Sequence, residues 1–165
     1  MKIRILDKTK KRKFIDAVSG LGIEKIPGLL LKGGKERVNV FSGGFSSEEL
    51  LALWRILPVE GLGLYLGKEI VNKRTGEKEA RLSLDGLHLL KNQVKKNIVK
   101  LDKEQEEKWW RGGDVGVGVG QVEEIKGGSF VAVMGIDEDF IGTGKLTMDK
   151  TMVMSFLPKE RRVRN

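Results

Sequence analysis

Cysteine is absent from the 165 residues, and histidine occurs once, as His88. Without cysteine the chain can form no disulfide, bind no zinc through thiolates and use no thiol nucleophile. A single histidine leaves no pair of histidines spaced for a zinc site, so we expect neither a metal nor a cofactor. Because His88 lies between Leu87 and Leu89, we expect an ordinary buried or half-buried side chain there rather than a ligand.

Long apolar runs are also missing. No stretch approaches the roughly 18 apolar residues of a membrane span, and no apolar region follows residues 1–4 as it would in a signal peptide. Lysine and glutamate are abundant while glutamine is scarce, a bias typical of thermophilic proteins. We therefore expect a cytoplasmic protein with no membrane partner.

The positive charge of the chain is concentrated at its two ends. The formal net charge is +8, of which residues 1–13 carry +6 and residues 141–165 carry +4, so that residues 14–140 carry −2. Basic charge segregated in this way is typical of proteins that contact phosphate backbones. Solvated, frayed termini would give the same pattern, but the distribution favours a nucleic-acid partner.

The first 90 residues, approximately, predict an α+β module. Its elements follow the order β-α-β-β-α-β-β, at residues 3–6, 9–18, 28–32, 37–41, 46–57, 62–71 and 79–84. Thr9 is the predicted N-cap of the first helix. Ser46 and Glu49 form a capping-box pattern at the start of the second helix, and Pro58 ends it. The glycine pair at 33–34 predicts a hairpin turn.

A polar, basic stretch at residues 91–97 marks a predicted domain boundary, which we place between residues 92 and 93. Beyond it the pattern predicts a strand at 98–101, a helix at 102–110 and strands at 129–135, 140–146 and 151–156. Short strands separated by glycine turns favour a small barrel or sandwich.

Two glycine motifs are similar to nucleotide-binding loops but lack the required context. The alternating glycines of residues 116–120 follow a helix, whereas a dinucleotide loop follows a strand and opens a helix. We predict instead a strand whose glycine face packs tightly. The Gly-Thr-Gly-Lys of residues 142–145 has Asp139 and Leu146 where a P-loop needs glycine and serine or threonine. We interpret it as a strand with glycines where another backbone approaches closely.

Four segments of the second half match a known pattern in the same order. They are residues 81–90, residues 101–114 ending in Trp-Trp-Arg-Gly-Gly-Asp, residues 130–133 followed by Gly-Thr-Gly-Lys, and residues 157–163, Leu-Pro-Lys-Glu-Arg-Arg-Val. Together they resemble the PUA-like domain at the C-terminus of Sun-family RNA 5-methylcytosine methyltransferases, although the methyltransferase and its cysteines are missing. The N-terminal half resembles the small α+β module that often precedes a PUA domain in stand-alone archaeal proteins.

The resemblance implies a small N-terminal α/β sandwich at residues 1–92, followed by a PUA-like β-barrel at residues 93–165 that binds RNA. Two adjacent tryptophans lie on the predicted helix of this second domain. Neighbouring helical residues point about 100° apart, so we expect one of Trp109 and Trp110 to pack into the core. The other is open to base stacking.

Five basic side chains of the second half form the predicted RNA-binding groove. Arg111 follows the helix ending at Trp110 and is free either to meet a phosphate or to stabilise the helix C-terminus. The resemblance implies that Lys145 faces the RNA. A β-strand over the tail would present Lys159 and Arg161 on one face, and a disordered tail is the alternative. Arg162 completes the groove, and the auxiliary basic patch consists of Lys10, Lys11, Arg12 and Lys13.

These features predict a non-catalytic protein that grips structured RNA. The resemblance implies ribosomal or transfer RNA, and a role in RNA modification or ribosome maturation. Lysines would supply non-specific charge and arginines bidentate phosphate contacts. Two alternatives are open: an RNA-binding subunit of an RNA-modifying enzyme such as a methyltransferase, and a ribosome-associated protein adaptor.

Overall fold

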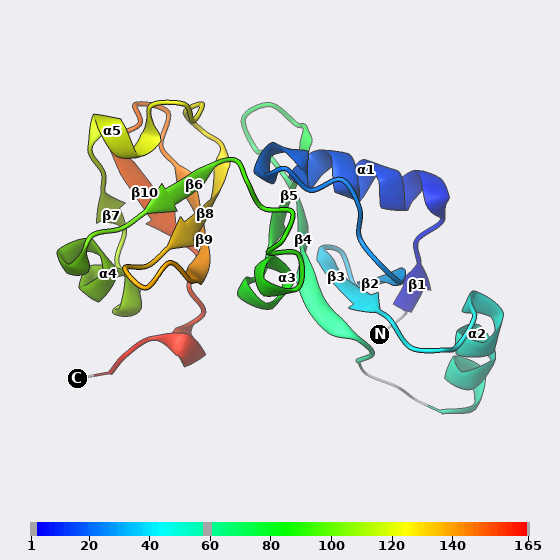
Figure 1. The fold of residues 1–165 in the computed structure, drawn as a ribbon. Coiled ribbons are helices and arrows are strands. Elements are labelled where there is room, and N and C mark those ends of the chain that lie inside the picture. Colours follow the sequence, from blue (N-terminus) through cyan, green and yellow to red (C-terminus); the bar gives the residue numbers. More distant parts are fainter. Residues whose placement is uncertain (1–2, 58–60, 165) are drawn as a thin grey trace.

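The structure, a computed structural model, describes residues 3–57 and 61–164. Two five-stranded sheets lie side by side and helices pack against both, so the architecture is mixed α/β (Figure 1). Residues 3–89 form, in chain order, β1 (Ile3–Ile5), α1 (Lys8–Val18), η1 (Ser19–Leu21), β2 (Leu29–Gly33), β3 (Arg37–Phe41), α2 (Ser47–Ile56), β4 (Leu64–Val71), β5 (Lys78–Leu82) and α3 (Leu84–Leu89). Apart from η1 and α3, this is the predicted order of elements.

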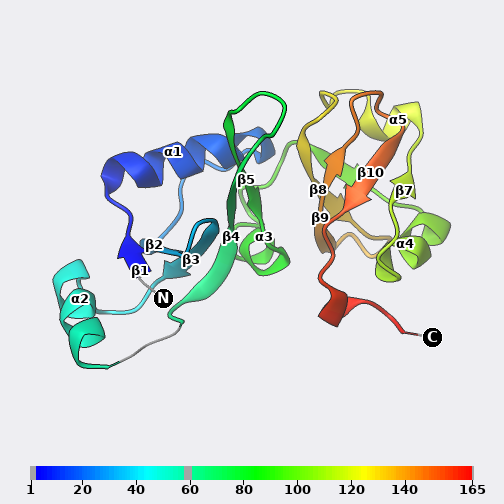
Figure 2. The same ribbon diagram turned by 180° about the vertical axis from the view of Figure 1, so that it is seen from behind.

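The first sheet is an antiparallel meander whose strands pair in sequence order from β1 to β5. Val38 and Leu66 lie on the face covered by α1 and share a core with Phe14 of that helix. Because side chains alternate along a strand, residues such as Arg37 and Arg81 point to the opposite face. Figure 2 shows this sheet from behind, with α1 along one side.

Helix α1 is capped two residues earlier than predicted. The carboxylate of Asp7 accepts a hydrogen bond from the Lys10 amide at 2.8 Å and caps the helix. The predicted Thr9 cap is therefore wrong, and Thr9 lies inside the first turn. The hydrogen bond from the Lys10 backbone holds the pKa of Asp7 below its ordinary value.

Helix α2 has the predicted capping box. The Ser46 hydroxyl accepts from the Glu49 amide at 3.2 Å, and the Glu49 carboxylate accepts from the Ser46 amide at 2.7 Å. Pro58, the predicted end of this helix, lies outside the described residues. In the part of the chain that the structure describes, the helices are too short or too polar to cross a lipid bilayer.

The second sheet curls around one aromatic side chain. Residues 98–161 form β6 (Ile98–Lys100), α4 (Lys103–Trp110), β7 (Val115–Gly116), α5 (Val119–Val122), β8 (Phe130–Met134), β9 (Phe140–Leu146), β10 (Met152–Ser155) and η2 (Lys159–Arg161). The strand order is β6-β8-β9-β10-β7, with β6 and β8 parallel. All five strands contribute to one core with the fully buried Trp109, and the sheet forms a curled half-barrel that is consistent with the predicted PUA-like barrel.

The two glycine segments of this half behave differently. Residues 116–120 do not form the predicted tight strand, because Gly118 precedes the short helix α5 and a Cβ added at Gly116 or Gly120 would meet nothing within 4 Å. In β9 the packing is close. A Cβ at Gly142 would lie 2.6 Å from the Trp109 ring, and one at Gly144 would lie 2.6 Å from the Met154 carbonyl oxygen. The predicted close approach of another backbone is thus confirmed at Gly144.

The two sheets meet where β5 and α3 contact β8 and β9. The Thr143 hydroxyl donates to the Leu82 carbonyl at 3.0 Å, and His88 Nε2 donates to the Phe140 carbonyl at 2.8 Å. Ala132 of β8 is fully buried in the core of the first sheet. His88 itself is exposed, so the predicted buried or half-buried position is wrong. We call this contact region the join.

Candidate nucleic-acid interface

Four of the five predicted RNA-binding residues gather where α4 ends and the C-terminal tail returns. Arg111 is the exposed C-cap of α4, and the Val163 amide donates to the Trp110 carbonyl at 2.8 Å, which holds the tail beside it. Neither Arg111 nor Lys159 forms an ion pair within residues 3–57 and 61–164. We define the tail surface as Arg111, Lys159, Arg161 and Arg162.

The tail is a 3₁₀ turn. Pro158 has a backbone φ of −58°, and its carbonyl accepts from the Arg161 amide at 3.0 Å, which closes the turn η2. Side chains of a 3₁₀ turn do not alternate with a period of two. The strand considered for these residues, with Lys159 and Arg161 on one face, is therefore wrong.

Arg161 and Arg162 have different partners. The Arg161 guanidinium contacts both carboxylate oxygens of Asp85, at 2.9 and 3.1 Å, and bridges the tail to α3. Arg162 donates through two nitrogens to the Leu157 carbonyl, each at 3.1 Å, and its guanidinium fills the space where Gly112 lacks a side chain. Arg162 therefore fixes the tail, whereas Arg161 faces the join.

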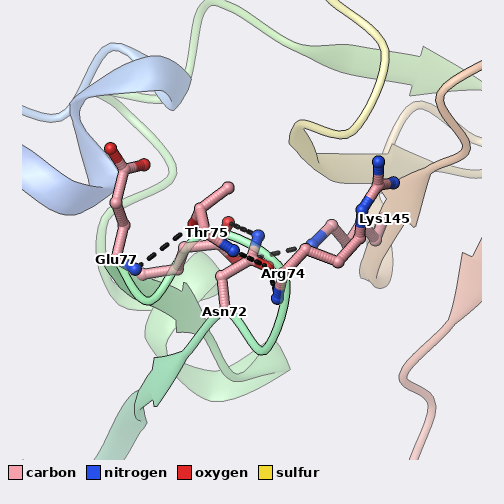
Figure 3. A network of polar contacts seen from close by, with 6 residues as sticks. Asn72, Arg74, Thr75, Glu77 and Lys145 are labelled. Atoms are coloured by element: carbon pink, nitrogen blue, oxygen red, sulfur yellow. Dashed lines mark hydrogen bonds and ion pairs between the residues drawn. The ribbon is translucent and has the colours of Figure 1, made fainter.

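Lys145 lies apart from the tail surface. Its Nζ is 3.3 Å from Glu79 Oε2, and the two side chains are 22% and 24% exposed. The other carboxylate oxygen of Glu79 accepts from Asn72 Nδ2 at 2.7 Å, which connects Lys145 to the turn between β4 and β5 (Figure 3). Lys145 Nζ also lies 5.0 Å from the centroid of the Phe130 ring. Its charge is thus compensated at the join.

The predicted auxiliary patch divides between two sides of α1. A groove of about 530 Å³ lies between α1 and the first sheet. The basic residues that line it are Arg4, Lys10, Lys13, Lys32 and Lys78. In contrast, Lys11 donates to the Gly28 carbonyl at 2.6 Å, and Arg12 pairs with Asp16 at 3.2 Å. Only Lys10 and Lys13 of the patch therefore belong to this groove, which we call the α1 groove.

Basic and aromatic side chains form three cation–aromatic pairs at the join, an arrangement that the sequence did not predict. The Arg37 guanidinium lies 4.2 Å from the centroid of the Tyr65 ring, and that of Arg81 lies 4.0 Å from the centroid of the Phe156 ring. The Phe156 and Phe130 centroids are 6.0 Å apart. We define the cation–aromatic ladder as Arg37, Tyr65, Arg81, Phe156, Phe130 and Lys145.

Partial burial shifts the pKa values of the central pair of the ladder, Tyr65 and Arg81. Burial lowers the pKa of the Arg81 guanidinium, while Tyr65 and Glu36 act in the opposite direction; arginine nevertheless stays charged in proteins. Burial raises the pKa of the Tyr65 phenol, and Arg81 and Arg37 oppose this. At neutral pH the ladder therefore presents a guanidinium beside an uncharged phenol, a combination suited to stacking on bases.

A cleft of about 420 Å³ lies between the ladder and the tail surface. Tyr65, Arg81 and Phe156 line it together with both members of the Asp85–Arg161 pair. The cleft therefore connects the two basic surfaces, and residues from both halves of the chain build its walls. We call it the join cleft.

The adjacent tryptophans have the predicted division of roles. Trp109 is fully buried and its Nε1 donates to the Ile141 carbonyl at 3.1 Å. Trp110 is half-buried and its Nε1 donates to the Glu106 carboxylate at 3.2 Å. One tryptophan thus packs into the core as predicted. Stacking of Trp110 on a base stays a prediction.

No protein-family model and no curated protein matches the sequence. Among solved structures, the chain is similar to the structure of a conserved PUA domain protein from Thermoplasma acidophilum. The TM-score is 0.59 at 15% sequence identity, and the match covers 97% of each chain. The chain therefore has the fold of a PUA-domain protein over nearly its whole length.

Proposed function

We propose that the chain is a non-catalytic protein that binds structured RNA across the join. The observation that carries this proposal is the cation–aromatic ladder, which reaches Arg161 of the tail surface at the join cleft. The PUA-domain fold supports the proposal, because the PUA-like resemblance implies an RNA-binding domain.

Two kinds of contact would combine on this surface. Guanidinium groups bind phosphate oxygens in bidentate fashion and also stack on bases. Aromatic rings stack on unpaired bases, each contributing about 1–3 kcal/mol to binding. The net charge of +8 would add long-range attraction to the phosphate backbone.

The resemblance to Sun-family enzymes favours ribosomal or transfer RNA as the target, with a role in RNA modification or ribosome maturation in the cytoplasm. In that role the chain would supply RNA affinity, and a separate RNA-modifying enzyme such as a methyltransferase would supply catalysis.

A second candidate function, that of a ribosome-associated adaptor, is favoured by α2. This helix lies at the end of the first sheet that is remote from the second sheet (Figure 1). It exposes Leu51 and Ile56, at 44% and 77%, while Leu50 is its fully buried anchor. Apolar residues gathered on an exposed surface are typical of protein contacts.

Alanine substitutions of the tail surface test the leading proposal. Replacing Arg111 and Arg161 should weaken binding to a transfer RNA transcript by about 1–3 kcal/mol per lost charge-assisted contact, measured by fluorescence anisotropy. Replacing Lys11 and Lys13 should cost less and should mainly flatten the salt dependence. Arg55→Ala, which removes an exposed arginine from α2, is the matched control and should leave affinity unchanged.

A salt titration of the unaltered protein completes the test. Release of several counterions should give a log–log slope of about −3 to −6. No RNA binding at low salt, or a flat response to salt, would contradict the proposal. If replacing Lys11 and Lys13 costs more RNA affinity than replacing Arg111 and Arg161, the main RNA contact lies on the N-terminal half. If RNA never binds, and substitution of Leu51 and Ile56 abolishes binding to a protein partner, the adaptor function replaces the RNA-binding proposal.

A further inference from the structure

The join cleft has the size and chemistry of a site for one small planar ligand. Its volume of about 420 Å³ falls near the lower end of the range of about 300–1,000 Å³ typical of ligand pockets. Phe156 and Tyr65 supply ring surface, and each is covered on one side by a guanidinium. A duplex does not fit such a volume, whereas a single flipped-out base does.

The cleft also contains groups that can read the edge of a base. Asp85 accepts hydrogen bonds only, and Arg161 donates them only. The two side chains contact each other at 2.9 Å and are 42% and 44% exposed, so both still face solvent. A base that offers an amino group beside a ring or carbonyl acceptor satisfies both of them. Uracil presents its single donor, N3–H, between two carbonyl oxygens that repel the Asp85 carboxylate, so it is the poorer match.

We propose that the join cleft holds one unpaired nucleotide of the bound RNA, with its base against the Tyr65, Arg81 and Phe156 side chains and its amino-bearing edge toward Asp85 and Arg161. This inference rests on the proposed RNA-binding function and adds a site to it. Residues from both halves build the cleft, so the same nucleotide contacts the N-terminal module and the PUA-like half at once.

A hairpin RNA with one bulged nucleotide tests the site directly. The bulge is adenine, uracil or the fluorescent amino-bearing base 2-aminopurine, and a fully paired hairpin serves as reference. We expect the protein to bind the adenine-bulged hairpin about tenfold more tightly than the paired one, since one stacked base contributes on that scale. Binding should also change the fluorescence of 2-aminopurine as its base leaves water for the cleft.

Two variants localise the effect. Phe156→Leu keeps an apolar side chain but loses the aromatic ring, and should remove most of the tenfold preference for the bulge. Phe45→Leu, at an exposed aromatic residue remote from the join, is its matched control and should keep the preference. Asp85→Asn should bring the adenine-bulged and uracil-bulged hairpins closer in affinity, because an amide both donates and accepts. A structural effect of the lost ion pair would weaken both RNAs equally.

The outcomes separate this inference from the proposed function. Equal binding of bulged and paired hairpins, with the steep salt dependence intact, would overturn the nucleotide site and leave RNA binding in place. An unchanged 2-aminopurine signal at saturation would do the same. If none of the hairpins binds at low salt, both proposals fail together. Circular dichroism of each variant shows that it is folded before its affinity is compared.

Discussion

Replacing Gly142 by alanine should lower the free energy of unfolding of the chain. The substitution places a methyl group 2.6 Å from Cζ2 and 3.1 Å from Cε2 of Trp109. Trp109 is fully buried, and its indole nitrogen is already engaged with the Ile141 carbonyl. The position of the ring is therefore held by its packing and by this hydrogen bond.

The size of the effect follows from that contact. Carbon atoms in good contact lie about 3.5–4.0 Å apart, so the ring or the strand must shift by about 1 Å. Overpacking of this kind costs about 1–3 kcal/mol, which for a chain of this size lowers the melting temperature by about 2–12 °C. The control is Gly120→Ala, because Gly120 lies in α5 with open space around it. That change should be neutral or stabilising by up to about 1 kcal/mol.

Differential scanning calorimetry measures both variants. The indole N–H resonance of Trp109 provides a local measurement, since it should shift in Gly142→Ala and stay in place in Gly120→Ala. If Gly142→Ala melts within 1 °C (about 0.3–0.5 kcal/mol for a chain of this size) of the unaltered chain, the close packing of Trp109 on β9 is refuted.

Three further expectations concern charge and chemistry. The hydrogen bond from the Thr147 hydroxyl holds the pKa of Asp149 below 3.8. An NMR titration should therefore find the Asp149 carboxylate titrating below pH 3.8, and Thr147→Ala should return its pKa toward 3.8. The stabilisation is complete above pH 3.8 and is lost as the pH falls through the lowered value. Glu79→Gln should raise RNA affinity at low salt, because it removes a negative charge and releases Lys145; an unchanged affinity would show that Lys145 does not contact RNA. Incubation with labelled S-adenosylmethionine or ATP and transfer RNA should give no product, and turnover that disappears on replacing His88 would contradict a non-catalytic role.

Much of the N-terminal half could be predicted from sequence because its signals are local. The capping box of Ser46 and Glu49 and the glycine pair of the β2–β3 turn fix their elements through neighbouring residues alone. Helix α3 was missed because its six residues are held by tertiary packing against β4 and β9 as well as by Ser83, whose hydroxyl accepts from the Gly86 amide. Taken alone, the sequence of residues 81–90 is as typical of a strand followed by a turn as it is of a short helix.

The candidate site was harder to predict for the opposite reason. Alternation of side chains along β3 and β5 could show that Arg37 and Arg81 point to the face of the sheet opposite to that of their buried neighbours in sequence. It could not show that the Phe156 ring, far along the chain, would lie under Arg81. Likewise, Arg161 and Arg162 are adjacent and identical in type, yet Arg161 binds Asp85 and Arg162 binds a backbone carbonyl. The two side chains point in different directions because they lie at the end of the turn η2.

Because Ala132 of β8 is fully buried in the core of the first sheet, the two halves cannot lose their packing independently. Separation of the two halves exposes Ala132. It also removes packing contacts of the partly buried Ile98 and Phe140, which pack against the same core. Unfolding should therefore be cooperative over the whole chain, with a single calorimetric transition, and a fragment cut at residue 92 would carry an unpaired apolar face. If RNA binds across the join as proposed, it should raise the unfolding free energy of both halves at once, since the proposed site exists only where they remain together.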